Sequence, residues 1–227
     1  YNLSTNYPNA KIFVITPIWR KDMNESNFRI SMAGRFNVEN ALTAYCVAKA
    51  LGVDENSIAH GLWKTEVKGR MNLFEKDGIT VIVDYAHNYL SFSKLYESLK
   101  ADYPGRRIVV VVGCPGGKNY IRRRDIGKLS GEYADYMYLT AEDPQFESVR
   151  KICEDIASYL EPYGTPYEII EDRAEAVEKS LMTAKKGDVV VLAAKGEEVY
   201  QKVEGKYVPY ESDLAIAKRC LEVLAVK

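Results

Sequence analysis

The sequence contains few residues of the kinds that bind metals or form disulfides. Among its 227 residues are two histidines, His60 and His87, and four cysteines, which lie far apart and form no C-x-x-C pair. A structural zinc site needs about four such ligands in closely spaced pairs, so we expect no metal site in this chain. Cysteines without close partners are typical of a reducing compartment, so we expect a cytoplasmic location.

The sequence also lacks a long apolar run, an excess of charge of one sign and a Walker A loop. No apolar run approaches the ~20 residues that a membrane-spanning helix requires. The formal net charge is −1, from 31 basic and 32 acidic residues, which gives no electrostatic reason to expect nucleic acid or a membrane as a partner. No G-x-x-x-x-G-K-[ST] motif occurs. The 47% of hydrophobic residues is nevertheless ample for a globular core.

The hydrophobic pattern differs before and after residue 67. Before it, the sequence predicts a strand over Lys11–Thr16, a polar loop over Arg20–Asn27, a helix over Asn37–Leu51 and a second helix from Asp54 to about Lys64. We expect residues 1–27 to be an atypical leader, foreign or rearranged. Residues 28–66 then form a small helical linker segment.

From residue 67 onward, short β-branched runs alternate with helical segments. The predicted strands are Thr80–Asp84, Ile108–Gly113, Tyr136–Thr140, Tyr167–Ile170 and Val189–Ala193. The predicted helices are Ser91–Leu99, Arg124–Glu132, Ser148–Leu160, Arg173–Ala184 and Ser212–Leu224. This alternation indicates βαβ units. The sequence therefore predicts an α/β domain over 67–227, with a doubly wound, mostly parallel sheet.

Polar residues follow four of these predicted strands directly. The four segments are Asp84–Asn88, Gly113–Lys118, Glu142–Gln145 and Ala194–Glu198. Ligands of open α/β sheets gather at the carboxyl ends of the strands. The four segments therefore predict one binding edge rather than four unrelated turns.

Three residues near the first of these strands each have two interpretations. Arg70 suits a phosphate, which its planar guanidinium would bind, or is an exposed arginine in a hairpin. Asp84 ends a buried strand, where an unpaired carboxylate is costly, and either caps the next helix or binds a ligand hydroxyl. His87 either contacts a purine or packs against its neighbours.

The basic residues after the second strand are also open to two interpretations. Gly116 and Gly117 would let a ligand approach the backbone, with Lys118 supplying positive charge. The run Arg122–Arg124 begins a predicted helix, where cations are disfavoured, and this predicts an acidic group opposite. A solvated basic turn is the alternative for Arg122 and Arg124.

Two further dipeptides are, taken alone, ordinary turn sequences. They are Asp143-Pro144 and Lys195-Gly196. Only their shared position at the predicted edge suggests a site.

Six motifs in order resemble one protein family. They are AGRFNVENALTA, VKGRM, VDYAHN, GCPGG, E-D-P and AKGEE. Together they resemble the C-terminal part of Mur ligases, most closely the MurE type, which adds the third amino acid to UDP-N-acetylmuramoyl-dipeptide. The likeness begins near Met32 and covers about 195 residues. It implies a Rossmann-like C-terminal domain that binds ATP and an amino acid.

The resemblance implies a set of ATP-binding residues. Asn37 and Asn40 match positions near the adenine, and Asp84 matches the carboxylate that holds the ribose. Arg70 matches the arginine that reaches the nucleotide phosphates, and it is the residue expected to act in catalysis. His87 lies in the same signature as Asp84.

The resemblance also implies residues that bind the incoming amino acid. Lys118 stands where the diaminopimelate enzymes carry an arginine. Asp143 and Gln145 stand at the Asn and Arg of their D-N-P-R motif. Ala194 and Glu198 match the first Gly and the Glu of G-K-G-H-E.

Departures from the family pattern bear on the amino acid. Gln145 lacks the bidentate carboxylate clamp of an arginine, which argues against meso-diaminopimelate. Asp143 and Glu198 make the predicted pocket acidic, which suits the side-chain ammonium of a lysine-like substrate. Glu197 replaces the family histidine and Asn88–Leu90 replaces T-P-D, so a MurE-like paralogue is the alternative.

The implied reaction uses ATP and Mg²⁺ and passes through an acyl phosphate. In the family, the phosphate loop and magnesium ligands belong to a central domain that precedes the matched region, and we expect the missing ligase domains in cis or on a partner chain. The expected partners are small molecules, an amino acid and a UDP-muramoyl peptide, with no nucleic acid and no membrane. A non-catalytic ligand-binding module and a folylpolyglutamate-synthetase-like ligase are the alternatives.

Overall fold

The computed structural model describes residues 30–32 and 34–224. The chain divides into two compact units, 1–66 and 67–227. Residues 1–27 and the strand predicted over Lys11–Thr16 lie outside the described residues. None of the helices in the described part of the chain has the length and apolar character needed to cross a membrane.

The first unit contains two helices, α2 (Arg35–Ala50) and α3 (Glu55–Lys64), close to the two predicted ranges. Gly52 turns the chain between them with a φ of 85°, a conformation that suits glycine. Asp54 starts α3, because its side chain accepts a hydrogen bond from the backbone N–H of Ser57 at 3.0 Å.

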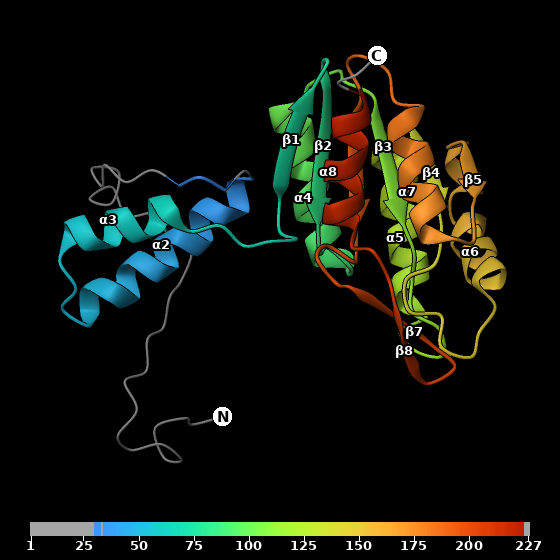
Figure 1. The fold of residues 1–227 in the computed structure, drawn as a ribbon, viewed down its shortest axis with the longest axis horizontal. Coiled ribbons are helices and arrows are strands. Elements are labelled where there is room, and N and C mark those ends of the chain that lie inside the picture. The colour runs from blue at the N-terminus through green and yellow to red at the C-terminus, as the bar shows by residue number, and fades with distance from the viewer. Residues whose placement is uncertain (1–29, 33, 225–227) are drawn as a thin grey trace. The chain divides into compact units, whose positions relative to one another are not determined.

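The second unit is built on a six-stranded sheet in the order β1-β2-β6-β3-β4-β5 (Figure 1). The strands are β1 (Asn72–Lys76), β2 (Ile79–Asp84), β3 (Ile108–Val112), β4 (Tyr136–Leu139), β5 (Tyr167–Ile169) and β6 (Val189–Ala193). Strands β2, β6, β3, β4 and β5 all run parallel to one another, and the edge strand β1 pairs with β2 antiparallel. This is the predicted mostly parallel sheet.

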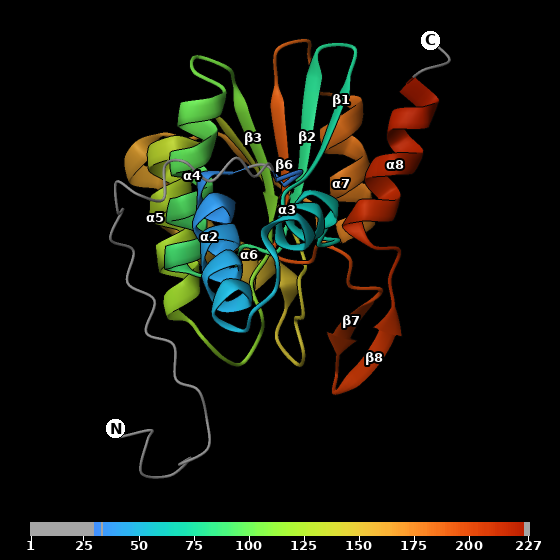
Figure 2. The ribbon, with the colours of Figure 1, turned by 90° about the vertical axis from the view of Figure 1, so that its left-hand side faces the viewer.

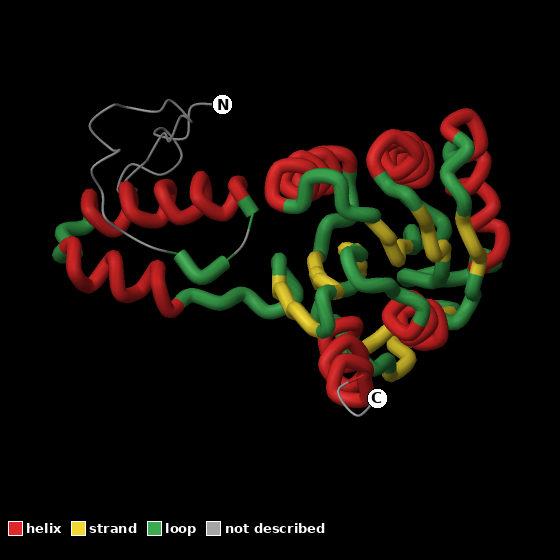
Figure 3. The backbone as a smooth tube through the Cα atoms, turned by 90° about the horizontal axis from the view of Figure 1, so that it is seen from above, coloured by secondary structure: helices red, strands yellow, loops and turns green. Residues whose placement is uncertain are grey.

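Helices cover both faces of this sheet (Figures 2 and 3). They are α4 (Tyr89–Asp102), α5 (Ile121–Tyr133), α6 (Val149–Ser158), α7 (Arg173–Met182) and α8 (Asp213–Leu224), with a 3-10 turn η2 (Glu161–Tyr163) after α6. Helices α4, α5 and α6 lie on one face, and α7 and α8 on the other. Strands β2, β3 and β6 are buried along their whole length, as expected for a parallel sheet that is covered twice.

The structure contains two hairpins, and three of their strands, β1, β7 (Tyr200–Val203) and β8 (Lys206–Pro209), were not predicted. Strand β1 joins β2 through Asp77 and Gly78, and β7 joins β8 through Glu204 and Gly205. All four turn residues have positive φ, between 49° and 79°, as two-residue hairpin turns require. The hydrophobic pattern does not reveal β1, β7 and β8, because these strands are short and, apart from Asn72, not buried. The Asp-Gly pair was the available signal.

Candidate functional site

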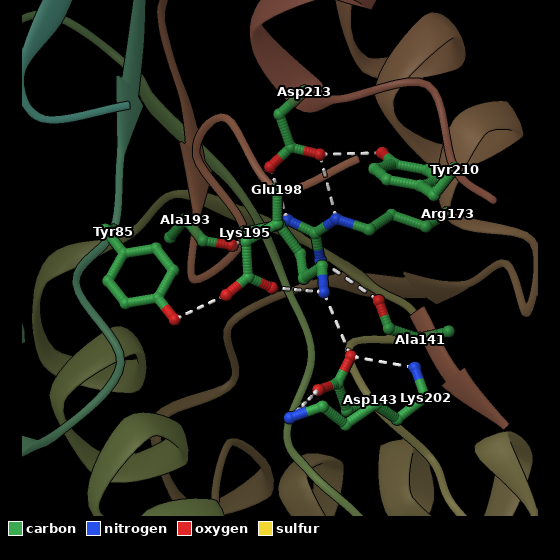
Figure 4. A network of polar contacts seen from close by, with 10 residues as sticks. All are labelled: Tyr85, Ala141, Asp143, Arg173, Ala193, Lys195, Glu198, Lys202, Tyr210 and Asp213. Atoms are coloured by element: carbon green, nitrogen blue, oxygen red, sulfur yellow. Dashed lines mark hydrogen bonds and ion pairs between the residues drawn. The ribbon is translucent and has the colours of Figure 1, made fainter. Parts of the chain in front are cut away.

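The carboxyl ends of β2, β4 and β6 bring polar side chains into one network. Figure 4 shows Tyr85 after β2, Asp143 after β4, and Lys195 and Glu198 after β6, joined by hydrogen bonds and ion pairs. This contact confirms that these polar segments share one edge of the sheet.

Lys195 lies at the centre of the network. Its side chain has no exposed surface, and its Nζ lies 2.9 Å from Asp143 Oδ1 and 2.5 Å from Glu198 Oε2. Lys195-Gly196 does form the predicted turn, since the Glu198 N–H donates to the Lys195 carbonyl at 3.0 Å. The Lys195 side chain is nevertheless buried, unlike that of an ordinary surface turn, and a buried ammonium requires paired carboxylates. One ammonium faces two carboxylates, so the three groups keep a formal charge of −1.

Asp143 is also held by the hairpin of β7 and β8. The Lys202 backbone N–H donates to Asp143 Oδ1 at 3.1 Å, and Lys202 Nζ lies 3.8 Å from Oδ2. Gln145, which has a φ of 56°, donates its N–H to the Lys202 carbonyl and accepts from the N–H of Glu204. The backbone of Gln145 thus fastens the hairpin beside Asp143.

Tyr85 connects this network to Arg70. The Tyr85 hydroxyl donates to Glu198 Oε1 at 2.6 Å, and the Arg70 guanidinium lies over the Tyr85 ring, 4.9 Å from its centre. Arg70 is exposed and makes no hydrogen bond or ion pair with the part of the chain that the structure describes. His87 packs edge-on against the Tyr85 ring, and its Nδ1 donates to the Tyr85 carbonyl at 2.8 Å.

Asp84 binds the backbone N–H groups of the residues that directly follow Arg70 and Tyr85. Its Oδ2 accepts from the N–H of Met71 and its Oδ1 from the N–H of Ala86, both at 2.8 Å. Burial raises the pKa of Asp84. Helix α4 is capped by Asn88 instead, so of the two interpretations of Asp84 the helix cap is wrong.

Glycines let the Arg70 segment lie directly on the segment after β6. A Cβ on Gly69 would lie 2.6 Å from the backbone nitrogen of Glu197, and one on Gly196 would lie 2.8 Å from the Gly69 carbonyl oxygen. Ala194, buried beside them, has a φ of 83°. The family places a glycine there, the residue that this conformation favours.

The segment after β3 packs on the segment after β4. Gly116 donates its N–H to the Asp143 carbonyl at 3.0 Å. Arg123 is buried and donates to both carboxylate oxygens of Glu147, which lowers the pKa of Glu147 to about 2. An acidic partner for the arginine run was predicted, and it belongs to Arg123. Lys118 is exposed and has no ion pair within the described residues.

Arg173 at the start of α7 was not singled out as a functional residue. Its buried guanidinium donates twice to Asp213, and also to the carbonyls of Ala141 and Ala193 (Figure 4). These carbonyls lie two residues before Asp143 and Lys195. Arg173 therefore holds together the two strand ends that carry the network.

Glu142 is a further group that the sequence did not single out. Burial raises its pKa to about 7, and the nearby Asp143 acts in the same direction. Its Oε2 is buried without a hydrogen-bond partner among the described residues. A proton on Glu142 at neutral pH would lower the cost of burying it.

Two predicted nucleotide residues lie in the first unit. Asn37 and Asn40 are on α2, and Asn40 Nδ2 donates to Asn37 Oδ1 at 3.2 Å. Their assignment to adenine stays a prediction. The described residues contain no group of three or more histidine, cysteine, aspartate and glutamate side chains arranged to hold a metal ion.

Comparisons with known proteins place these features in a family. The family model described as Mur ligase, glutamate ligase domain, matches residues 69–196. The UDP-N-acetylmuramoyl-L-alanyl-D-glutamate--L-lysine ligase of Streptococcus sanguinis is 41% identical over 198 residues, which cover 86% of this chain and 40% of that protein. The UDP-N-acetylmuramyl-tripeptide synthetase of Ligilactobacillus salivarius is 37% identical over 201 residues, covering 88% and 39%.

A solved structure has the same fold. A UDP-N-acetylmuramoyl-L-alanyl-D-glutamate--2,6-diaminopimelate ligase superposes with a TM-score of 0.65 at 27% identity, covering 87% of this chain and 40% of that one. The chain thus spans about two fifths of the length of these relatives. Since the family model matches more than half of the sequence, the chain belongs to the Mur ligase family, with residues 69–196 as its glutamate ligase domain.

Proposed function

We propose that this chain is the amino-acid-binding part of an ATP-dependent ligase that adds the third amino acid, lysine-like rather than diaminopimelate, to UDP-N-acetylmuramoyl-dipeptide. The observation that carries the proposal is the pairing of Asp143 and Glu198 around the buried Lys195. The names of the two sequence relatives support the reaction, and one of them is a lysine ligase.

The two carboxylates of the network favour an ammonium group over a carboxylate as ligand. Asp143 and Glu198 share one buried ammonium, Lys195. The second cation, Lys202, is partly exposed and lies 3.8 Å from Asp143, so a substrate ammonium would take its place. Gln145 offers no cation to a second carboxylate. Lys118, exposed at the same edge, is assigned to the α-carboxylate, and the backbone at Ala194 lines the same segment as Glu198.

Nucleotide binding is assigned first to residues of the second unit. Arg70 fits a phosphate, because its guanidinium is exposed and free of ion pairs with the described residues. Asp84 uses one lone pair of each oxygen on the backbone, and the others are left for a ribose hydroxyl. His87 completes the set proposed for the second unit. Asn37 and Asn40 of the first unit are assigned to adenine from the family resemblance alone.

The contribution of this chain to the reaction is positioning. ATP supplies the phosphoryl group that activates the carboxylate of the acceptor, and Mg²⁺ would be held by residues outside the described cluster. The residues described here hold the amine close to that activated carbonyl, which lowers the entropic part of the barrier. We place this ATP-consuming step in the cytoplasm.

Calorimetric titration tests the proposal. The 227-residue chain is titrated with L-lysine, meso-diaminopimelate and L-glutamate, each with and without ATP. We expect saturable binding of L-lysine and much weaker binding of the other two. Preference for glutamate would favour the folylpolyglutamate alternative, and binding of none of the three would overturn the proposal.

A further inference from the structure

The Tyr85 side chain touches both a residue assigned to the nucleotide and a residue assigned to the amino acid. Its ring lies under the Arg70 guanidinium, and its hydroxyl donates to Glu198. Neither assignment requires a tyrosine here. The two contacts use different parts of the side chain, so they are separable by mutation.

The position of Tyr85 is fixed from several sides. The His87 ring packs on the Tyr85 ring, and His87 Nδ1 donates to the Tyr85 backbone carbonyl. Asp84 accepts a hydrogen bond from the N–H of Ala86, the next residue. The Arg70 segment lies against the Glu198 segment through the close approach of Gly69 and Gly196. The Tyr85 side chain therefore lies in contact with both segments.

The two oxygens of Glu198 have different donors. Oε1 accepts from the Tyr85 hydroxyl at 2.6 Å and Oε2 from Lys195 at 2.5 Å. Two donors on opposite oxygens fix the plane of the carboxylate. Without the hydroxyl, only Lys195 would orient it, and the carboxylate would be free to turn toward that ammonium. A substrate ammonium would then meet a carboxylate that is less well directed.

We propose that Tyr85 is a positioning residue that couples the two ligand sites: its ring supports Arg70, and its hydroxyl orients Glu198 for the substrate ammonium. This inference rests on the proposed function. It requires that ATP bound at Arg70 raise the affinity for the amino acid, and by thermodynamic linkage the amino acid raises the affinity for ATP equally.

Two variants of Tyr85 separate its two contacts. Tyr85→Phe keeps the ring under Arg70 and removes only the hydroxyl, whereas Tyr85→Ala removes both. Tyr138→Phe is the matched control, because its hydroxyl contacts Thr183 at 2.9 Å near the end of α7, outside the network. Each chain is titrated calorimetrically with L-lysine and with ATP, alone and in combination, after its thermal midpoint has been measured.

The expected pattern is specific to positioning. Tyr85→Phe weakens L-lysine binding about tenfold, the effect of losing a hydrogen bond to a charged group, and leaves ATP affinity unchanged. It also abolishes the roughly fivefold or larger enhancement of lysine affinity by ATP that we expect in the wild type. Tyr85→Ala weakens both ligands, and Tyr138→Phe weakens neither.

The remaining outcomes separate this inference from the proposed function. If the wild type binds L-lysine and Tyr85→Phe binds it equally well, the inference is overturned and the proposed function stands. The coupling is likewise overturned if ATP leaves the wild-type lysine affinity unchanged. If the wild type binds no lysine at all, the proposed function fails, and the inference fails with it.

Discussion

Arg173 and Asp213 form a bidentate ion pair in which neither side chain is exposed to solvent. Buried charges of this kind depend on each other, since removal of one leaves the other desolvated and unpaired. The same guanidinium donates hydrogen bonds to the backbone carbonyls of Ala141 and Ala193, at the ends of β4 and β6. The pair is thus a structural support of the candidate site.

Replacing either partner of this pair should destabilise the chain strongly. We expect Arg173→Met and Asp213→Leu each to lower the free energy of unfolding by about 3–5 kcal/mol. The double variant should lose clearly less than the sum, because it buries no unpaired charge. Urea denaturation of the wild type, the two single variants and the double variant measures this coupling. Arg219→Met, which breaks exposed pairs with Glu178 and Glu211, is the control and should change stability little. Additive losses at 173 and 213 would contradict the assignment.

A side chain at Gly69 should destabilise the chain more than one at a glycine with open space around it. A Cβ there would lie 2.6 Å from the nitrogen of Glu197, whereas at Gly105, with nearly the same φ (74° against 72°), a Cβ would meet nothing within 4 Å. Gly105→Ala should therefore cost only the backbone strain, about 1–2 kcal/mol. Gly69→Ala should cost more, because Glu197 must also shift. Thermal unfolding of both variants gives the comparison, and equal losses would show that the close approach is unimportant.

The sheet could be predicted from the sequence because its buried strands are β-branched apolar runs such as 189–193. The shared edge followed from the rule that ligands gather at carboxyl ends of parallel strands. Lys195 could not be recognised, since its partner Asp143 lies 52 residues away and a lysine before a glycine is typical of a surface turn. Only the fold shows that such a charge is buried and paired.

Replacing Ala194 by glycine should not destabilise the chain and is expected to stabilise it slightly. Its φ of 83° is strained for a residue with a Cβ, and this strain is of order 1 kcal/mol. Ala194→Gly relieves the strain, so we expect the free energy of unfolding to stay level or rise by up to about 1 kcal/mol. Ala193→Gly, one residue earlier within β6, has no such strain to relieve and should be destabilised by about 1 kcal/mol. Chemical denaturation distinguishes them, and equal destabilisation would be evidence against strain at Ala194.

Glu142 should make the stability of the chain depend on pH. Its pKa rises from 4.5 to about 7 on folding, so the folded state holds the proton more tightly than the unfolded state. The resulting stabilisation is fully present below pH 4.5 and is lost as the pH rises through 7. A shift of this size corresponds to about 3 kcal/mol.

Glu142→Gln removes this dependence, because glutamine stays neutral. We expect the variant to be more stable than the wild type at pH 8, with the difference shrinking toward pH 5. Urea denaturation at several pH values measures it, and Glu161→Gln, at an exposed position, controls for the loss of one carboxylate. Parallel stability curves for the wild type and Glu142→Gln between pH 5 and 8 would mean that Glu142 is ionised in the folded chain, and that its buried oxygen has a partner.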